Sequence, residues 1–375
     1  MRIGVDCRSL QEPQSAGVSV YTKQLLRAML DLPESQEHQF VFFVNASGLG
    51  KNQEVLEIIQ HGLESPLVEW RIHSVPNKLI TTLQVLESRP GFNWMFGEVD
   101  VVFFPNIHFL PLVKQKIPYV LTMHDLSFER YPECFSAKGR LWHRLIKPAV
   151  LTKLADKVIA VSEHTRRDLI DLYYISPNKI EVVYPGLPKA APAVFIDTPE
   201  QYILSLATLE PRKNLEALIE AFDLLRDDYP NLKLVLVGGG GWKSTAIQSR
   251  VANDPRIEYR GYVDEPTKQA LLTAANAFVY PSLYEGFGFP PLEAQACGVP
   301  VIVGAHSSLP EVVGDSALLV DVLDASSIAR SIKHVISDEP LRTELIKKGY
   351  ENVRRYQWQQ SAEKTLAAIK SVVQT

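Results

Sequence analysis

The chain has 375 residues, of which 46% are hydrophobic and 22% are charged, and its formal net charge is -4. This length exceeds what one hydrophobic core usually organises, so two domains are expected. The composition is that of an ordinary globular protein. Its acidic balance argues against a general nucleic-acid-binding protein, because the domains of such proteins are usually basic.

The cysteines and the amino-terminal residues indicate the cellular compartment. Cys7, Cys134 and Cys297 lie far apart and offer neither a disulfide framework nor a zinc site, so a reducing cytoplasm is the simplest expectation. The first residues turn polar too soon for a signal peptide, and no apolar run is long enough to span a bilayer. Any membrane contact is therefore expected to be peripheral, on the inner face of the membrane.

Apolar runs that alternate with helical stretches predict an α/β fold with a mostly parallel, doubly wound sheet. A strand over 3–5 precedes a helical run from Val18 to Leu30, where Tyr21, Leu25 and Met29 recur at a helical spacing. The further strands of this first half are predicted over 40–44, 101–104, 118–122, 158–161 and 180–183.

The segment 185–192 is the clearest break in composition, and we place the interdomain linker there. Its three prolines and one glycine suit neither a helix nor a central strand. The alternation then restarts, with strands predicted over 202–206, 232–237, 257–259, 277–280 and 301–303. Two such series predict two Rossmann-like domains that face a cleft, with ligands at the carboxyl ends of the strands.

The stretch 281–298 combines a strand exit, a glycine-containing loop and a helix start. Pro290 and Pro291 open the helix, whose free N–H groups suit an anionic phosphate. Glu285 precedes the loop and Glu293 lies in the first helical turns. A carboxylate beside a phosphate is favourable when it binds hydroxyls, and a nucleotide sugar carries both groups. Acidic residues that simply stabilise the helix start explain the pattern equally well.

Glu285 and Glu293 resemble the E-x7-E signature of the retaining glycosyltransferases of family 4, which have the GT-B fold. The resemblance implies that Glu285 lies over the donor sugar and that Glu293 binds the nucleotide ribose. It spans nearly the whole chain, through the segments 124–127, 161–162, 210–214 and 309–311. Among the subgroups, the chain is most similar to bacterial mannosyltransferase-B-like enzymes of polysaccharide assembly. The loop residues assigned to donor binding are Gly286, Phe287 and Gly288.

The GT-B resemblance also implies how the chain is divided. Residues 1–188 would form the acceptor-binding domain, and residues 198–357 would form the domain that binds the nucleotide-sugar donor. The helix expected over 358–375 would cross back and pack on the first domain.

Arg212 and Lys213 lie between a predicted strand and the helix that begins near Asn214. Two cations at such a junction suit a diphosphate, although a solvated pair of loop cations is common. Their context, Glu-Pro-Arg-Lys-Asn, is similar to the pyrophosphate-binding segment of the family. Many members carry a further arginine upstream, where this chain has Ala-Thr-Leu at 207–209. These two residues would therefore supply the positive charge alone.

His124 and Asp125 follow the strand predicted over 118–122. A lone histidine in this position is more often structural than catalytic, but the pair resembles the His-Asp element of the family, where the histidine lies near the donor sugar and the reacting centre. Histidine can donate or accept a hydrogen bond. We assign His124 as a sugar contact, not as an obligatory base, and Asp125 to donor binding.

Glycine-containing turns complete the predicted donor site. Gly238 opens a glycine run that fits neither a dinucleotide fingerprint nor a P-loop, because Trp242 and Lys243 stand where glycines are required. We predict a turn that lines the nucleotide side of the cleft. Tyr262 and Val263 resemble the segment whose backbone meets the nucleotide base, although turn geometry explains them almost as well. Gly17, at the first helix, is also assigned to donor binding.

Residues 138–157 are rich in Lys and Arg, interleaved with apolar residues, and Asp156 is their only acid. We favour an amphipathic helix whose apolar stripe packs on the sheet. The alternative is a helix that contacts an anionic membrane or a lipid-pyrophosphate acceptor.

The expected reaction needs no metal and no other cofactor. The sequence has no D-x-D motif and no metal-ligand spacing of His and Cys, so Arg212, Lys213 and helix N-termini would balance the leaving diphosphate. The resemblance implies retaining transfer of a hexose, mannose from GDP-mannose, to a glycan or lipid-linked saccharide. UDP-, dTDP- and ADP-sugars remain alternatives, as do a GT-B epimerase or hydrolase and a non-catalytic binding module. A nicotinamide-dependent dehydrogenase would lack its glycine fingerprint.

Overall fold

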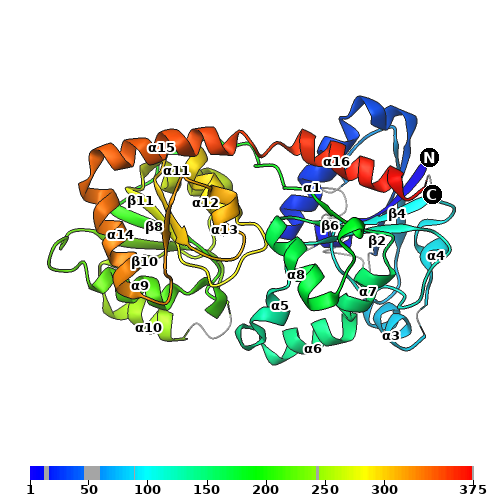
Figure 1. The fold of residues 1–375 in the computed structure, drawn as a ribbon, viewed down its shortest axis with the longest axis horizontal. Helices are drawn as coiled ribbons and strands as arrows, with labels where there is room; N and C mark the ends of the chain where they lie inside the picture. The colour runs from blue at the N-terminus through cyan, green and yellow to red at the C-terminus, as the bar shows by residue number, and fades with distance from the viewer. Residues whose placement is uncertain (12–16, 46–59, 88, 242–244, 374–375) are drawn as a thin grey trace. The chain divides into compact units, whose positions relative to one another are not determined.

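The computed structural model describes residues 1–11, 17–45, 60–87, 89–241 and 245–373 (Figure 1). The chain forms two compact units. The first comprises Met1–Leu126, Ala137–Gly186 and Gln357–Thr375, and the second comprises Ser127–Ser136 and Leu187–Tyr356. The chain thus returns to the first unit at its end. The short segment Ser127–Ser136 belongs to the second unit, an assignment that the sequence analysis did not predict.

The first unit is built on a seven-stranded sheet in which all neighbouring strands are parallel. Most residues of its inner strands are apolar and buried, as expected for a parallel sheet that is covered on both faces. In spatial order the strands are β3 (Val68–His73), β2 (Gln39–Asn45), β1 (Arg2–Asp6), β4 (Val101–Phe104), β5 (Tyr119–Met123), β6 (Lys157–Ala160) and β7 (Ile180–Val182).

Helices connect these strands. In the described residues of this unit the α-helices are α1 (Gly17–Leu30), α3 (Asn77–Glu87), α4 (Phe92–Phe96), α6 (Ala137–Ile146), α7 (Pro148–Leu154), α8 (Glu163–Tyr173) and α16 (Trp358–Ser371). The 3-10 helices are η1 (Arg8–Gln11), η2 (Pro33–Glu37) and η4 (Pro177–Lys179).

The last helix, α16, packs on the first unit, which confirms the predicted crossing (Figure 1). It contacts α1 and the strands β4, β5 and β6. Its buried face includes Leu366 and Ile369, and the ring of Trp358 lies 5.9 Å from the ring of Tyr21 on α1. The apolar residues of the carboxyl-terminal sequence are thereby removed from water against the amino-terminal half of the chain.

The second unit has a six-stranded parallel sheet. In spatial order its strands are β10 (Ile257–Tyr259), β9 (Lys233–Val237), β8 (Tyr202–Leu206), β11 (Ala277–Tyr280), β12 (Val301–Gly304) and β13 (Leu318–Val320). Its helices are α5 (Ser127–Arg130), η3 (Pro132–Cys134), η5 (Pro211–Lys213), α9 (Leu215–Asp223), α10 (Thr245–Asn253), α11 (Glu265–Ala274), α12 (Phe289–Ala296), α13 (Leu309–Val313), α14 (Ala325–Ser337) and α15 (Glu339–Val353).

The structure corrects the prediction for residues 138–157. These residues form two helices and the start of a strand, because α6 ends at Ile146 and α7 begins at Pro148. Lys147 between them has a left-handed backbone, with φ 55°. A residue before proline is disfavoured in the helical region, so the proline sets the break. None of the helices in the described part of the chain is both long and apolar enough to cross a membrane.

Candidate active site

The loop after β11 is the centre of the candidate site in the second unit. Gly288 ends this loop with φ +110°, and a Cβ at this position would lie 2.9 Å from Cδ2 of Leu309, so the turn favours glycine. The hydroxyl of Ser308 lies 2.9 Å from the carbonyl oxygen of Glu285 and 2.8 Å from that of Phe287. The residue that precedes α13 therefore fixes the backbone of the loop.

The segment 210–214 is tied to the same loop. The amide of Leu283 donates to the carbonyl of Arg212 at 2.8 Å. Asn214 adopts a left-handed backbone, which asparagine tolerates, and directly precedes α9. Its side-chain amide donates to the carbonyl of Val322 at 2.9 Å and to that of Pro281 at 3.3 Å. Two stretches that the sequence analysis singled out separately are thus bonded to each other.

Five side chains from these two stretches and the end of β11 form a buried polar group, which we call the Glu285 cluster: Glu210, Arg212, Lys213, Tyr280 and Glu285. The Nζ of Lys213 lies 2.6 Å from Oε1 of Glu285 and donates to the Tyr280 hydroxyl at 2.8 Å. The guanidinium of Arg212 lies 3.1 Å from Oε2 of Glu285 and 2.6 Å from Oε1 of Glu210. It also donates to the carbonyl of Tyr284 at 2.7 Å. One carboxylate therefore holds both predicted diphosphate ligands.

Electrostatics fix the protonation states of this cluster. Burial alone would raise the pKa of Glu285, but Lys213 and Arg212 outweigh it and lower the pKa to about 2. Burial and the neighbouring Arg212 lower the pKa of Lys213, while burial raises that of the Tyr280 hydroxyl. Glu285 is therefore a carboxylate, and Tyr280 is a neutral phenol. A carboxylate in this state can accept hydrogen bonds from hydroxyls.

Glu293, in α12, lies outside the Glu285 cluster. Its Oε1 is 3.0 Å from Nζ of Lys268, which also contacts Glu265 at 2.9 Å. Burial raises the pKa of Glu293, and Lys268 partly offsets this effect. The two glutamates of the signature therefore have different cationic partners. Sequence reasoning missed Lys268, for which the i, i+3 pair with Glu265 on α11 is the only local signal.

The glycine turn after β9 contacts the segment after β10. The amide of Gly238 donates to the carbonyl of Gly261 at 2.8 Å, and the Tyr259 hydroxyl donates to the carbonyl of Gly238 at 2.8 Å. The turn thereby brings Gly238 beside the segment that includes Tyr262 and Val263. The ring of Tyr262 is exposed, whereas Val263 packs partly on the core. Trp242 and Lys243, which end the glycine run, lie outside the described residues.

In the first unit, His124 follows β5. Its Nε2 lies 2.8 Å from the carbonyl oxygen of Pro105, and its ring is perpendicular to that of Tyr21, with ring centroids 4.7 Å apart. Burial lowers the pKa of His124, so the neutral ring donates through Nε2 and presents Nδ1 as an acceptor. Asp125, the next residue, is half-buried. The Thr165 hydroxyl donates to the carbonyl of His124 at 3.3 Å.

The segment 161–162 supports this arrangement. The Ser162 hydroxyl caps α8 by accepting from the amide of Thr165 at 3.0 Å, and the same threonine holds His124. Gly17 lies exposed at the start of α1, and in the described part of the chain no heavy atom would lie within 4 Å of a Cβ there. Packing among the described residues therefore does not explain the glycine.

Sequence reasoning missed a further polar pair at the carboxyl end of β1. The guanidinium of Arg8 bonds both oxygens of the buried Asp6, with Nη2 to Oδ2 at 2.7 Å and Nε to Oδ1 at 2.9 Å. His108, which follows β4, lies near this pair, and burial lowers its pKa to about 4. The sheet order places β1 beside β4 and β4 beside β5. Because these strands are parallel, Asp6 and Arg8 lie at the same edge of the sheet as His124.

Comparison with known proteins decides the family. Residues 15–190 match the family model described as Glycosyltransferase Family 4, and residues 188–352 match the model for glycosyl transferases group 1. O-antigen chain mannosyltransferase B of Escherichia coli is 34% identical over 272 residues, which cover 67% of this chain and 70% of that protein. The chain belongs to glycosyltransferase family 4.

Solved structures show that this glycosyltransferase has the GT-B fold. Sucrose-phosphate synthase from Thermosynechococcus elongatus matches with a TM-score of 0.74 at 19% identity, over 99% of each chain. HepE of Anabaena, solved in complex with UDP and glucose, matches with a TM-score of 0.68 at 18% identity, over 99% of this chain and 100% of that one. At these identities the likeness concerns the fold alone.

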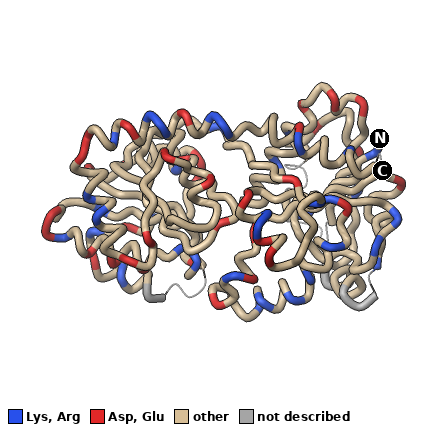
Figure 2. Tube along the Cα trace, in the orientation of Figure 1, with Lys and Arg blue, Asp and Glu red and all other residues tan. Residues whose placement is uncertain are grey.

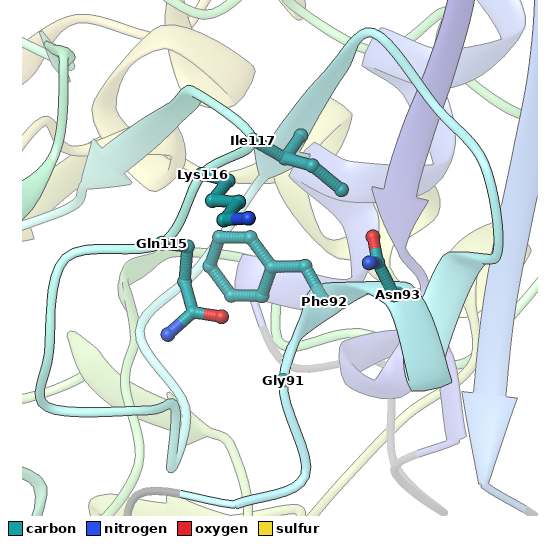
Figure 3. A pocket seen from close by; sticks show the side chains of 6 residues that line it. All are labelled: Gly91, Phe92, Asn93, Gln115, Lys116 and Ile117. Carbon is teal, nitrogen blue, oxygen red and sulfur yellow. The ribbon is translucent and has the colours of Figure 1, made fainter.

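A pocket of about 210 Å³ in the first unit of the glycosyltransferase is separate from this site (Figure 3). Its lining residues lie in two segments, Gly91–Asn93 at the start of α4 and Gln115–Ile117 before β5. The pocket therefore lies near the amino end of β5, whereas His124 follows the carboxyl end. Ligands of doubly wound sheets bind at the carboxyl ends of the strands, so we assign this pocket no role in the reaction.

Proposed function

We propose that this glycosyltransferase transfers mannose from GDP-mannose, with retention of anomeric configuration, to a glycan or lipid-linked saccharide in polysaccharide or glycolipid assembly. The Glu285 cluster is the observation that carries the reaction type. It joins the two cations expected at a diphosphate to the carboxylate expected at a sugar. The similarity to an O-antigen mannosyltransferase supports mannose as the sugar.

The cluster is suited to hold a leaving diphosphate. Arg212 and Lys213 are fixed by Glu210, Glu285 and Tyr280, so little reorganisation is needed when negative charge develops on the leaving group. The two carboxylates offset the two cations within the ligand-free cluster. The backbone N–H groups at the start of α12 would therefore add to the attraction for the donor. A metal ion is not required in this proposal.

In the proposed step, the acceptor hydroxyl attacks the anomeric carbon from the face that the diphosphate leaves. The bond between the anomeric carbon and the phosphate oxygen breaks, and the departing GDP takes the acceptor proton. Glu285 accepts hydrogen bonds from sugar hydroxyls, as its low pKa allows. The neutral ring of His124 accepts one through Nδ1. Glu293 binds the ribose hydroxyls.

The test is incubation of the purified protein with GDP-mannose and a mannose-terminated oligosaccharide, with nuclear magnetic resonance of the first product formed. We expect an α-mannoside and GDP, with equal rates before and after treatment with a chelator. Parallel reactions contain UDP-, dTDP- and ADP-sugars in place of GDP-mannose. Inversion at the anomeric carbon would exclude the retaining mechanism. Faster transfer from another nucleotide sugar would exclude GDP-mannose as the preferred donor.

A reaction without acceptor separates transfer from the epimerase and hydrolase alternatives. A transferase consumes little donor in that reaction, whereas a hydrolase or epimerase consumes it at the same rate with and without acceptor. A rise in the unfolding temperature with GDP-mannose, but not with mannose alone, would report donor binding by mass action even where the acceptor chosen is poor.

A further inference from the structure

The helix α6 has an inner face that is anchored on the first unit. Ile146, at its end, is 1% exposed. The ring of Trp142 packs edge-on against Phe109, with ring centroids 6.2 Å apart. These contacts fix which side of the helix faces outward.

The outward face of α6 carries two leucines. Leu141 is 54% exposed and Leu145 is 37% exposed. Residues four positions apart lie one above the other on a helix, so the two side chains form a single apolar strip. The interpretation favoured from the sequence placed the whole apolar stripe of this region against the sheet. Because these leucines remain in contact with water, that interpretation does not account for them.

Cations flank this strip on both sides. At 100° per residue, exposed Arg140 and Arg144 lie on one side of the leucines, and exposed Lys138 lies on the other. No Asp or Glu occurs between residues 137 and 155, although the whole chain has a formal net charge of -4. Figure 2 shows Lys and Arg gathered along α6. The positive charge is therefore local to this helix and its neighbour α7.

We propose that this outward face of α6, made of Leu141 and Leu145 with Lys138, Arg140 and Arg144, docks the first unit on an anionic phospholipid bilayer. Apolar side chains enter the headgroup boundary while flanking cations contact anionic lipids, which is the pattern of an interfacial helix. A protein partner needs roughly 800 Å² of complementary surface on each side. A strip of two leucines on a ten-residue helix provides much less, whereas a bilayer requires no matching shape.

The experiment is sedimentation of the full chain with lipid vesicles, and it requires neither donor nor acceptor. One set of vesicles contains phosphatidylcholine alone, and the other contains phosphatidylcholine mixed with phosphatidylglycerol. We expect binding to the mixed vesicles that weakens with added salt, and little binding to phosphatidylcholine. The variants Leu141→Ser/Leu145→Ser and Lys138→Glu/Arg144→Glu should each bind at least about tenfold more weakly.

Matched controls lie in other parts of the chain. Leu224→Ser/Leu323→Ser removes two exposed leucines from the second unit, and Lys347→Glu/Lys364→Glu makes the same change in net charge elsewhere. Both controls should bind like the unaltered chain. Absence of vesicle binding, equal binding to both kinds of vesicle, or equal loss in the α6 variants and their controls would each overturn the proposal. The α6 substitutions are at exposed positions, so all variants should keep the unfolding temperature of the unaltered chain.

Discussion

The Nζ of Lys213 lies 2.6 Å from Oε1 of Glu285, although 72 positions separate the two residues in the chain. Both side chains are nearly buried, and Arg212 completes the ion pair from the other side of the carboxylate. Burying an unpaired charge is energetically costly, so each of the two residues offsets the cost of burying the charge of the other. Stability and the proposed chemistry therefore depend on the same contact.

Replacement of Lys213 by Met should reduce both the stability of the protein and its transferase activity. Among the described residues, the Glu285 carboxylate would keep Arg212 alone as a cationic partner, and we expect a loss of about 3 kcal/mol in the free energy of unfolding. We expect turnover to fall about 100-fold to 1,000-fold, because a fixed charge at the leaving diphosphate is lost. Urea unfolding and the rate of release of the nucleoside diphosphate measure the two effects.

The double variant Lys213→Met/Glu285→Gln separates these effects. Removing both charges leaves no unpaired carboxylate, so most of the lost stability should return. The activity should not return, since the cation and the sugar contact are both absent. Recovery of turnover together with stability would mean that Lys213 acts only through folding.

The pH dependence of stability should report the same pair. The pKa of Glu285 is lowered from 4.5 to about 2 in the folded protein, so the folded state binds this proton less readily than the unfolded state. Its contribution, about 3 kcal/mol, is therefore fully present above about pH 5 and is lost as the pH falls towards 2. Unfolding by urea across this range should show a steeper decline for the unaltered chain than for Glu285→Gln. Parallel declines would contradict the assigned shift.

Much of the fold could be predicted because each inner strand of the two sheets contains a short run of apolar residues. The strands that sequence reasoning missed are the edge strands β3 and β13. In β3, charged Glu69 and Arg71 interrupt the apolar residues, and β13 has only three residues. A strand with a partner on one side only can be short and partly polar, so its hydrophobic signal is weak. Pro148 is a local signal for the helix break at Lys147, but the sequence analysis considered the charges of this region and not the proline.

The candidate site was predictable in its parts but not in its pairings. The motifs identified Glu285, Arg212 and Lys213 separately, whereas only the fold brings them together. Tyr280 was assigned to a strand and given no role, although its hydroxyl contacts Lys213. Tyr280 is the last residue of β11, at the carboxyl edge of the sheet. Its sequence context does not distinguish such a residue from one that lies in the core. The partner of Glu293, Lys268, comes from a different helix for the same reason.

Glu293 provides a test of the proposed ribose contact. Substitution Glu293→Gln removes a charged acceptor, and we expect KM for the donor to rise about tenfold with little change in kcat. A donor with a deoxyribose should bind the unaltered enzyme more weakly, but should lose little further affinity for the variant. Equal losses from the deoxy donor in both proteins would show that Glu293 contacts another part of the ligand. The control is Glu265→Gln, which keeps the Lys268–Glu293 contact and should leave KM unchanged.

The glycine turn after β9 offers a matched pair of substitutions. Gly238 has φ +149°, and a Cβ there would lie 2.1 Å from the carbonyl oxygen of Ala207, which is backbone and cannot move aside as a side chain can. Gly238→Ala should therefore lower the free energy of unfolding by about 2 to 3 kcal/mol and weaken donor binding, because the turn would move away from Gly261. Gly240, two residues later, is exposed, and a Cβ there would meet no atom of the described residues within 4 Å. Gly240→Ala should change stability by less than about 0.5 kcal/mol. Urea unfolding of the two variants and donor-induced shifts in unfolding temperature provide the comparison, and similar stabilities for the two would show that the turn does not depend on glycine at 238.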